Sequence, residues 1–217
     1  MNPVLRGDAL VLDLGDVHRS LSSAVLGGGL GWVRTWMNLQ VERGYDCHDP
    51  ESDLRKAATG LEAPVVGMLT ATPVARFTTG AQGCARTVAT VGLSHPLAAA
   101  GTVPGPLPSV GTINLLVILA EPLTDAGLVN ALQTAVEAKA QALAAAQVPA
   151  LNADGFATGT ATDSICIACP PGGRETFAGP ATPHGADVAR AVYQAVMVGA
   201  AARPEASEGS VLGVESG

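Results

Sequence analysis

The sequence predicts one α/β or α+β domain, in which a mixed β-sheet is flanked by two long helices. Short apolar runs rich in Val, Ile and Thr precede and follow single long helical segments, which is the element order of such domains. No internal repeat or break in composition marks a second domain, and 217 residues fit one domain of ordinary size. We therefore expect one domain over residues 1–200. The polar, Gly- and Ser-rich residues 201–217 are expected to be a disordered tail.

Most of the predicted strands lie in the first part of the chain. Apolar runs of strand-like composition are found at residues 9–14, 32–41, 64–70, 84–93 and 111–119. A polar and then Gly-rich connection over residues 20–31 separates the first two. Pro50 begins a short helix that ends near Gly60. The Pro- and Gly-rich residues 94–110 form a loop of a length that is typical of binding loops, lids or disordered pieces.

Two long helices are predicted in the second part of the chain. The first covers residues 123–147, with Thr124 as a cap and Pro149 just past its end. Its apolar side chains recur at three- and four-residue spacing, at Leu128, Leu132, Ala135, Val136 and Leu143. Residues 156–169 are predicted to form a strand. The second helix covers residues 186–202, and its apolar face packs either internally or against a twin subunit, so a homo-oligomer stays open.

Charge and composition exclude several classes of partner. The net charge is −7 and no basic cluster is present, so we expect no binding to nucleic acid. Residues 87–120 contain no charged side chain, but their Pro and Gly residues prevent a continuous helix, so we expect no membrane span. The start of the chain lacks the pattern of a secretory signal, which predicts a cytoplasmic protein.

The four cysteines are expected to be reduced thiols in that compartment. Cys166 and Cys169 form a CxxC pattern, and a zinc site made of Cys47, His48, Cys166 and Cys169 is one interpretation of it. Buried structural cysteines fit better, because the pair ends an apolar run and does not open a helix. We expect no metal and no cofactor.

Three segments carry a resemblance to a known family. They are Gly-Thr-Ile-Asn at 111–114 with Glu-Ala-Lys at 137–139, Ala-Thr-Gly-Thr-Ala-Thr-Asp-Ser-Ile at 157–165, and Phe-Ala-Gly-Pro-Ala-Thr-Pro-His-Gly at 177–185. In this order and spacing the chain resembles the adenosylcobinamide amidohydrolases over roughly residues 10 to 198. The resemblance implies a hydrolase that salvages cobinamide. Such an enzyme cleaves the amide between the aminopropanol arm and the corrin ring, and leaves adenosylcobyric acid.

Three residues are candidates for the catalysis of amide hydrolysis, which needs an activated water and a base. The resemblance makes His48 the first candidate for the base, although a lone histidine on a loop is usually only solvated. Asp163 is the second, because a buried carboxylate can act as a base, and the alternative is an Asp that binds nearby backbone. Glu137 is the third, on the Glu-Ala-Lys run, and the alternative is a solvated helix face.

Candidates for substrate binding are polar or backbone-exposing residues near these motifs. The alternation of Thr158, Thr160 and Thr162 places three hydroxyls on one face of the predicted strand, unless Thr is there only because it favours strands. Thr182 precedes a helix and is either a ligand or the helix cap. The remaining candidates are Gly28 and Gly29 in the Gly-rich connection, Asp49 beside His48, and Thr112 and Asn114 in the first motif.

Two other functions remain open on the sequence. A corrinoid-binding module would hold a small-molecule corrinoid without cutting it. A transferase of acyl or phosphoryl groups would use the same Gly- and Thr-rich loops on another metabolite. The hydrolase hypothesis requires that the stretches 112–114, 158–163 and 179–184 meet around one cavity.

Overall fold

A computed structural model describes residues 2–102 and 111–202 of the chain. Within these ranges its strands are β1 Val4–Arg6, β2 Ala9–Ser22, β3 Gly29–Gln40, β4 Val65–Thr70, β5 Thr78–Gln82, β6 Ala85–Val91, β7 Pro96–Leu97, β8 Ile113–Leu119, β9 Gly159–Thr160 and β10 Ser164–Cys169. The α-helices are α1 Pro50–Ala57, α2 Asp125–Ala145 and α3 Pro183–Ala201, and short 3₁₀ turns cover Val74–Arg76 and Ala99–Gly101.

Eight of the strands in the described part of the chain form one mixed sheet. Its order is β4-β3-β2-β10-β8-β6-β5, with β1 paired to β2, while β7 and β9 form a separate small ribbon. The pairs β3/β4 and β8/β10 are parallel, and the other neighbours are antiparallel. The predicted mixed sheet with two long helices is therefore confirmed.

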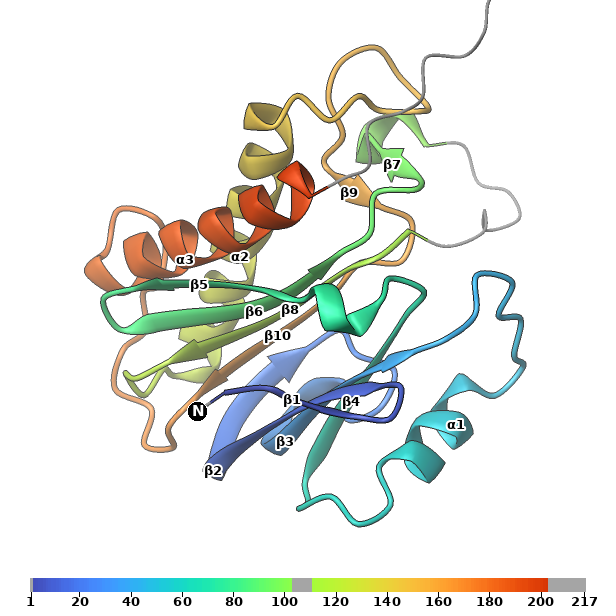
Figure 1. Ribbon diagram of the computed structural model, residues 1–217. Helices are drawn as coiled ribbons and strands as arrows, with labels where there is room; N and C mark the ends of the chain where they lie inside the picture. Colours follow the sequence, from blue (N-terminus) through green and yellow to red (C-terminus); the bar gives the residue numbers. More distant parts are fainter. Residues whose placement is uncertain (1, 103–110, 203–217) are drawn as a thin grey trace, which may run out of the picture.

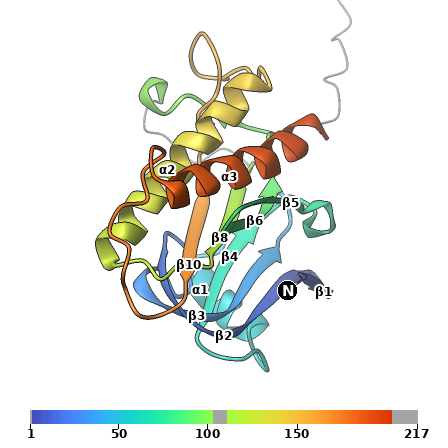
Figure 2. The ribbon, with the colours of Figure 1, turned by 90° about the vertical axis from the view of Figure 1, so that its left-hand side faces the viewer.

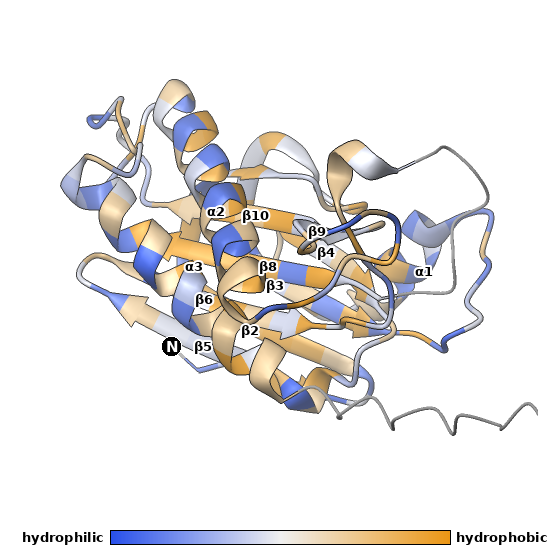
Figure 3. Ribbon diagram, turned by 90° about the horizontal axis from the view of Figure 1, so that it is seen from above, coloured by the Kyte–Doolittle hydropathy of each residue, from blue (hydrophilic) through white to orange (hydrophobic). Residues whose placement is uncertain are grey.

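The central strands β8 and β10 are buried along their whole length. Alternate side chains of a strand point to opposite faces, so continuous burial requires cover on both sides. One face, with Leu115, Val117 and Ile167, packs against α2 and α3. The opposite face, with Leu116 and Ile118, packs against apolar side chains of β2, β3 and β4. Figure 3 shows these hydrophobic strands beneath the two helices.

The two long helices lie side by side on one face of the sheet (Figures 1 and 2). Thr124 caps α2 by accepting a hydrogen bond from Gly127 N, as predicted. The helix α3 approaches β5 closely, because Gly80 has no side chain: a Cβ there would lie 2.0 Å from Ala191 O. In the described residues no helix is both long enough and apolar enough to cross a membrane.

The sheet curls, so that β2, β3 and β4 pass beneath the face of β8 and β10 that the helices leave uncovered (Figure 1). Trp36, Met68 and Leu12 fill the inside of this curl. The short helix α1 lies outside it and inserts Leu54 into a third apolar cluster with Met37. The open end of the curl, near the beginnings of β8 and β10, holds the cavity described below.

Several predicted boundaries are wrong. The strand predicted at 9–14 continues to Ser22, across an irregularity in its pairing with β3 between Asp13 and His18. The single strand predicted over 156–169 is two strands, β9 and β10, separated by a turn at Ala161. The strands β1 and β5 were not predicted, nor was β7, which lies in the predicted loop 94–110. Residues 103–110 of the predicted long loop and 203–217 of the predicted tail lie outside the described residues.

Candidate active site

Two distant segments meet at the open end of the curled sheet. Because β8 and β10 are parallel, with Asn114 beside Ser164, the residues that precede them lie at the same edge. The hydroxyls of Thr112 and Thr162 are 2.7 Å apart and hydrogen-bonded across this junction. The first and second motif segments are therefore brought together by the parallel pair.

Asp163 is the centre of this junction. Its carboxylate accepts hydrogen bonds from Ile113 N at 3.0 Å, Thr160 N at 3.1 Å, the Thr160 hydroxyl and the ammonium of Lys139. Lys139 comes from α2, and the two side chains of the ion pair are only 8% and 11% exposed. The carboxylate thus connects β8, β9 and α2. Its bonds to Ile113 N and Thr160 N agree with the alternative that Asp163 binds nearby backbone.

Gly159 makes room for this ion pair. A Cβ built on it would lie 2.4 Å from Asp163 Oδ2 and 2.7 Å from Lys139 Nζ, which is closer than real Cβ atoms come to other atoms. The lack of space for a Cβ therefore explains why position 159 in the second motif is a glycine.

A cavity of about 770 Å³ opens beside Asp163. That volume lies in the upper part of the range of small-molecule sites. Hydroxyl groups and the ends of three strands form one side, and the loop before α1 forms the other. The lining residues are Ser23, Val25, Val41, Arg43, Gly44, Tyr45, Asp46, Cys47, Pro50, Met68, Leu69, Thr70, Thr112, Thr162, Asp163 and Ser164.

The loop side of the cavity is fastened to α1. The Tyr45 hydroxyl and the Cys47 thiol both donate to Asp53 Oδ2, at 2.9 Å and 3.3 Å. The hydrogen bond from Tyr45 is the main cause that lowers the pKa of Asp53. Burial, followed by the hydrogen bonds with Cys47 and Asp53, raises the pKa of the Tyr45 phenol above its usual range. This three-residue clamp holds both sides of position 46.

A buried amide network lies beneath the cavity and joins the two walls of the curl. Asn114 of β8 donates through Nδ2 to Asn38 Oδ1 of β3 at 2.9 Å and to Leu69 O of β4 at 2.8 Å. Asn38 donates in turn to Thr90 of β6 at 2.8 Å. The three side chains are fully buried. Strands that are not neighbours in the sheet are thereby joined through its interior.

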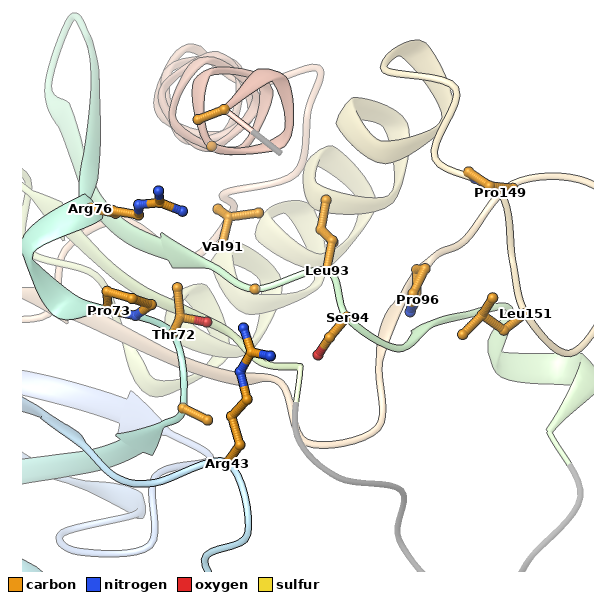
Figure 4. A pocket seen from close by; sticks show the side chains of 14 residues that line it. Arg43, Thr72, Pro73, Arg76, Val91, Leu93, Ser94, Pro96, Pro149 and Leu151 are labelled. Carbon is orange, nitrogen blue, oxygen red and sulfur yellow. The ribbon is translucent and has the colours of Figure 1, made fainter. Parts of the chain in front are cut away.

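A second, smaller cavity of about 460 Å³ lies next to the first and shares Arg43 with it (Figure 4). Its walls are mostly apolar, and two guanidinium groups, of Arg43 and Arg76, reach it from different segments. In the part of the chain that the structure describes, no acidic side chain lines it. They are Arg43, Ala71, Thr72, Pro73, Arg76, Val91, Gly92, Leu93, Ser94, Pro96, Pro149, Leu151, Gly199 and Ala202.

The three threonines predicted on one strand face do not share a face, because the chain turns between β9 and β10. Thr158 is exposed and accepts a hydrogen bond from Ala99 N at 3.0 Å. Thr160 donates to Asp163, and Thr162 faces the larger cavity beside Thr112. The prediction of a row of hydroxyls is wrong, and each threonine has a different partner.

The third motif segment lies at the opposite end of the sheet. Thr182 caps α3 and accepts a hydrogen bond from Gly185 N at 3.1 Å. Of the two roles considered for it, ligand binding and helix cap, the structure shows the helix cap. His184 contacts Cys84, and Ala120, just past the end of β8, donates to Cys84 O. The expectation that 179–184 meets the other two stretches around one cavity is therefore wrong, because α3 begins beyond the carboxyl ends of β8 and β10.

The other predicted site residues lie near the cavity or away from it. His48 is exposed and does not line the cavity, although Cys47 does, and Asp49 caps α1 by accepting from Ser52 N. Glu137 is exposed on α2. Gly28 lies in the turn before β3 and Gly29 is the first residue of β3, and both are exposed and outside the lining. Asn114 lies beneath the cavity, in the amide network.

Sequence reasoning missed Lys139, and also the loop residues Arg43 and Asp46 that line the larger cavity. Lys139 belongs to the same Glu-Ala-Lys run as Glu137 and lies on the buried side of α2, with Ala135, Ala138 and Ala142. A lysine at the spacing of an apolar stripe was the available signal, because such a group is rarely buried without a partner.

The cysteines do not form the zinc site that was considered. Cys166 and Cys169 are buried and Cys47 lies on the loop of the clamp, and all four thiols are free. Among the described residues no group of three or more His, Cys, Asp or Glu side chains is arranged to hold a metal ion.

Comparison with known proteins agrees with the resemblance in the sequence. A relative from Halobacterium salinarum, named adenosylcobinamide amidohydrolase, is 38% identical over 130 residues, which are 57% of this chain and 53% of that protein. The match therefore spans about half the length of that relative. The CbiZ family model, described as adenosylcobinamide amidohydrolase, matches residues 3–208. Since that match covers nearly the whole chain, the protein belongs to the adenosylcobinamide amidohydrolase family.

Proposed function

We propose that this protein hydrolyses the amide that joins the aminopropanol arm of adenosylcobinamide to its corrin ring. The products are adenosylcobyric acid and aminopropanol, so the reaction returns a salvaged precursor to cobalamin synthesis. The requirement that three stretches meet around one cavity is met only by 112–114 and 158–163, whereas 179–184 leads into α3 at the other end of the sheet. The proposal therefore rests on the family match over residues 3–208 and not on that requirement. Four free thiols, two of them buried, support a reducing compartment such as the cytoplasm.

The larger cavity supports this chemistry. Its volume of about 770 Å³ and its open side suit a bulky guest of which one part enters the site. A corrinoid carries many amide groups on its rim, and Ser23, Thr112, Thr162 and Ser164 supply hydroxyls that donate to or accept from amides. We assign Thr112 and Thr162 to substrate binding.

We assign Asp163 and Lys139 to the architecture of the site. Their ion pair fixes the turn that places Thr162 opposite Thr112. Hydrolysis of an amide depends on the position of the scissile carbonyl to within fractions of an ångström. A shift of this turn would therefore lower turnover.

Incubation of the purified protein with adenosylcobinamide, followed by chromatographic separation, tests the proposal. We expect one aminopropanol and one adenosylcobyric acid for each cobinamide consumed. A change in corrinoid absorbance on mixing, with the amide intact, would favour a binding module. An unchanged corrinoid spectrum together with no cleavage would show that the protein neither binds nor cleaves adenosylcobinamide, and would refute the proposal.

A further inference from the structure

Among residues 2–102 and 111–202, two carboxylates line the larger cavity, those of Asp46 and Asp163, and only that of Asp46 can take a proton without losing a partner. A carboxylate offers about four lone-pair positions. The four donors described above fill those of Asp163, two on each oxygen. A general base needs an open lone pair within reach of the water that it activates. Asp163 is therefore a poor base.

Asp46 has the opposite character. It is exposed, lines the cavity, and makes no hydrogen bond or ion pair with any residue in the described ranges. Its neighbours Tyr45 and Cys47 are both fastened to Asp53. The backbone of Asp46 is thus held at a fixed place in the wall, while its carboxylate is free to accept a proton.

Arg43, three residues earlier, lines the same cavity. Its guanidinium has no carboxylate partner among residues 2–102 and 111–202. In Figure 4 it lies near Thr72 and Ser94 of the smaller cavity, and since Arg43 lines both cavities, it stands where the two adjoin. A guanidinium presents several N–H donors and keeps its charge at any working pH, which suits a developing oxyanion. A carboxylate and a guanidinium, neither with an ion-pair partner among the described residues, therefore come from the same loop.

We propose that Asp46 is the general base of the hydrolysis and that Arg43 stabilises the oxyanion, an inference that rests on the proposed function. Asp46 takes a proton from water, and the hydroxide oxygen bonds to the amide carbon. The carbonyl electron pair moves to the oxygen, beside Arg43. When the oxyanion collapses, the C–N bond breaks, and the proton on Asp46 passes to the leaving nitrogen. The new acid group on the ring then gives its proton to water, which leaves a carboxylate on the ring and free aminopropanol.

Asp46→Asn and Glu42→Gln form a matched pair for the test. Both carboxylates are exposed on the same loop, but Glu42 lines neither cavity. We expect Asp46→Asn to lower kcat by about 10²- to 10⁴-fold, with KM and the melting temperature nearly unchanged. Glu42→Gln keeps the wild-type rate. Arg43→Gln lowers kcat by about 10²- to 10³-fold.

Chemical rescue separates a base from a structural residue. Added formate should restore part of the turnover of Asp46→Ala, because a free carboxylate can enter the space of the missing one, and it should leave the wild type unaffected. Full kcat in Asp46→Asn, or loss of its corrinoid binding with no rescue of Asp46→Ala, would overturn the proposal. The proposal would also be overturned if His48→Ala lost turnover while the Asp46 variants kept it. If the wild type itself releases no aminopropanol, the proposed function fails first.

Discussion

Lys139 and Asp163, 24 residues apart in the sequence, form an ion pair that is almost removed from solvent at the wall of the larger cavity. It connects the middle of the long helix α2 to the turn that precedes the central strand β10. Buried ion pairs add little net stability compared with apolar residues, but loss of one partner leaves the other charge uncompensated. The pair therefore fixes where the turn lies.

Lys139→Met should destabilise the protein by about 3 kcal/mol, because Asp163 keeps its backbone donors but loses its counter-charge. Turnover should fall as well, since the turn that carries Thr162 is released. Urea unfolding and the cobinamide assay measure the two effects. Lys56→Met is the control: its pair with Asp53 is exposed and should cost at most about 1 kcal/mol. Equal costs for the two variants would refute the buried role of Lys139.

Gly159→Ala should disturb the same ion pair without removing a charge. The added methyl group overlaps Asp163 Oδ2 and Lys139 Nζ, and neither group can withdraw without breaking the pair. We expect a loss of about 1–3 kcal/mol and a matching loss of turnover. Gly31→Ala, where the nearest atom is Ser20 Oγ at 4.0 Å, serves as the comparison and should be nearly neutral. A stable, fully active Gly159→Ala would speak against the steric argument.

Substitutions in the buried amide network should lower the free energy of unfolding by different amounts. Asn114→Ala leaves Leu69 O and Asn38 Oδ1 without their donors in the interior, so the free energy of unfolding should drop by about 2–4 kcal/mol. Thr90→Val removes only the acceptor of Asn38 and should cost about half as much. Denaturant titration of both variants measures this order, and the reverse order would contradict it.

Alkaline pH should weaken the fold through Cys166. Complete burial raises the pKa of this thiol to about 12, against about 8.5 in an unfolded chain. Because the folded value is the higher one, the folded state keeps a proton that the unfolded state loses. The stabilisation is thus full below pH ~8.5 and declines as pH rises toward the folded pKa, by about 1.4 kcal/mol per pH unit.

Unfolding experiments between pH 8 and 11 measure that slope. The variant Cys166→Ala has no thiol to titrate at this position, so its slope should be shallower than that of the wild type. Identical slopes in the two proteins would show that Cys166 does not contribute.

The sequence predicts the central architecture well, because its signals are local. Continuous apolar runs identify β8 and β10, and the cap at Thr124 and the proline after Gln147 bound α2. The curl of the sheet is not predictable in this way, since it arises from packing between residues far apart, such as Trp36 and Leu116. Val136 shows a limit of periodicity, because it matches the apolar stripe and yet is 44% exposed.

The site is less predictable than the fold. The motifs locate Thr112, Thr162 and Asp163, which do meet, because a parallel strand pair brings them to one edge. The same motifs also contain Thr182, which serves a helix cap at the other end of the sheet. A motif marks residues that the fold needs as well as residues that face a ligand, and only the three-dimensional arrangement separates the two.

Occupation of the larger cavity by the corrinoid is tested most directly by Thr162→Trp. This exposed residue lines the cavity, so an indole there should occupy part of the space that the corrinoid needs without entering the core. Val136→Trp, on the exposed side of α2, is the matched control. We predict that Thr162→Trp abolishes both the corrinoid absorbance change and aminopropanol release while its melting temperature stays near that of the control. Wild-type turnover in Thr162→Trp would contradict the placement of the reaction in this cavity.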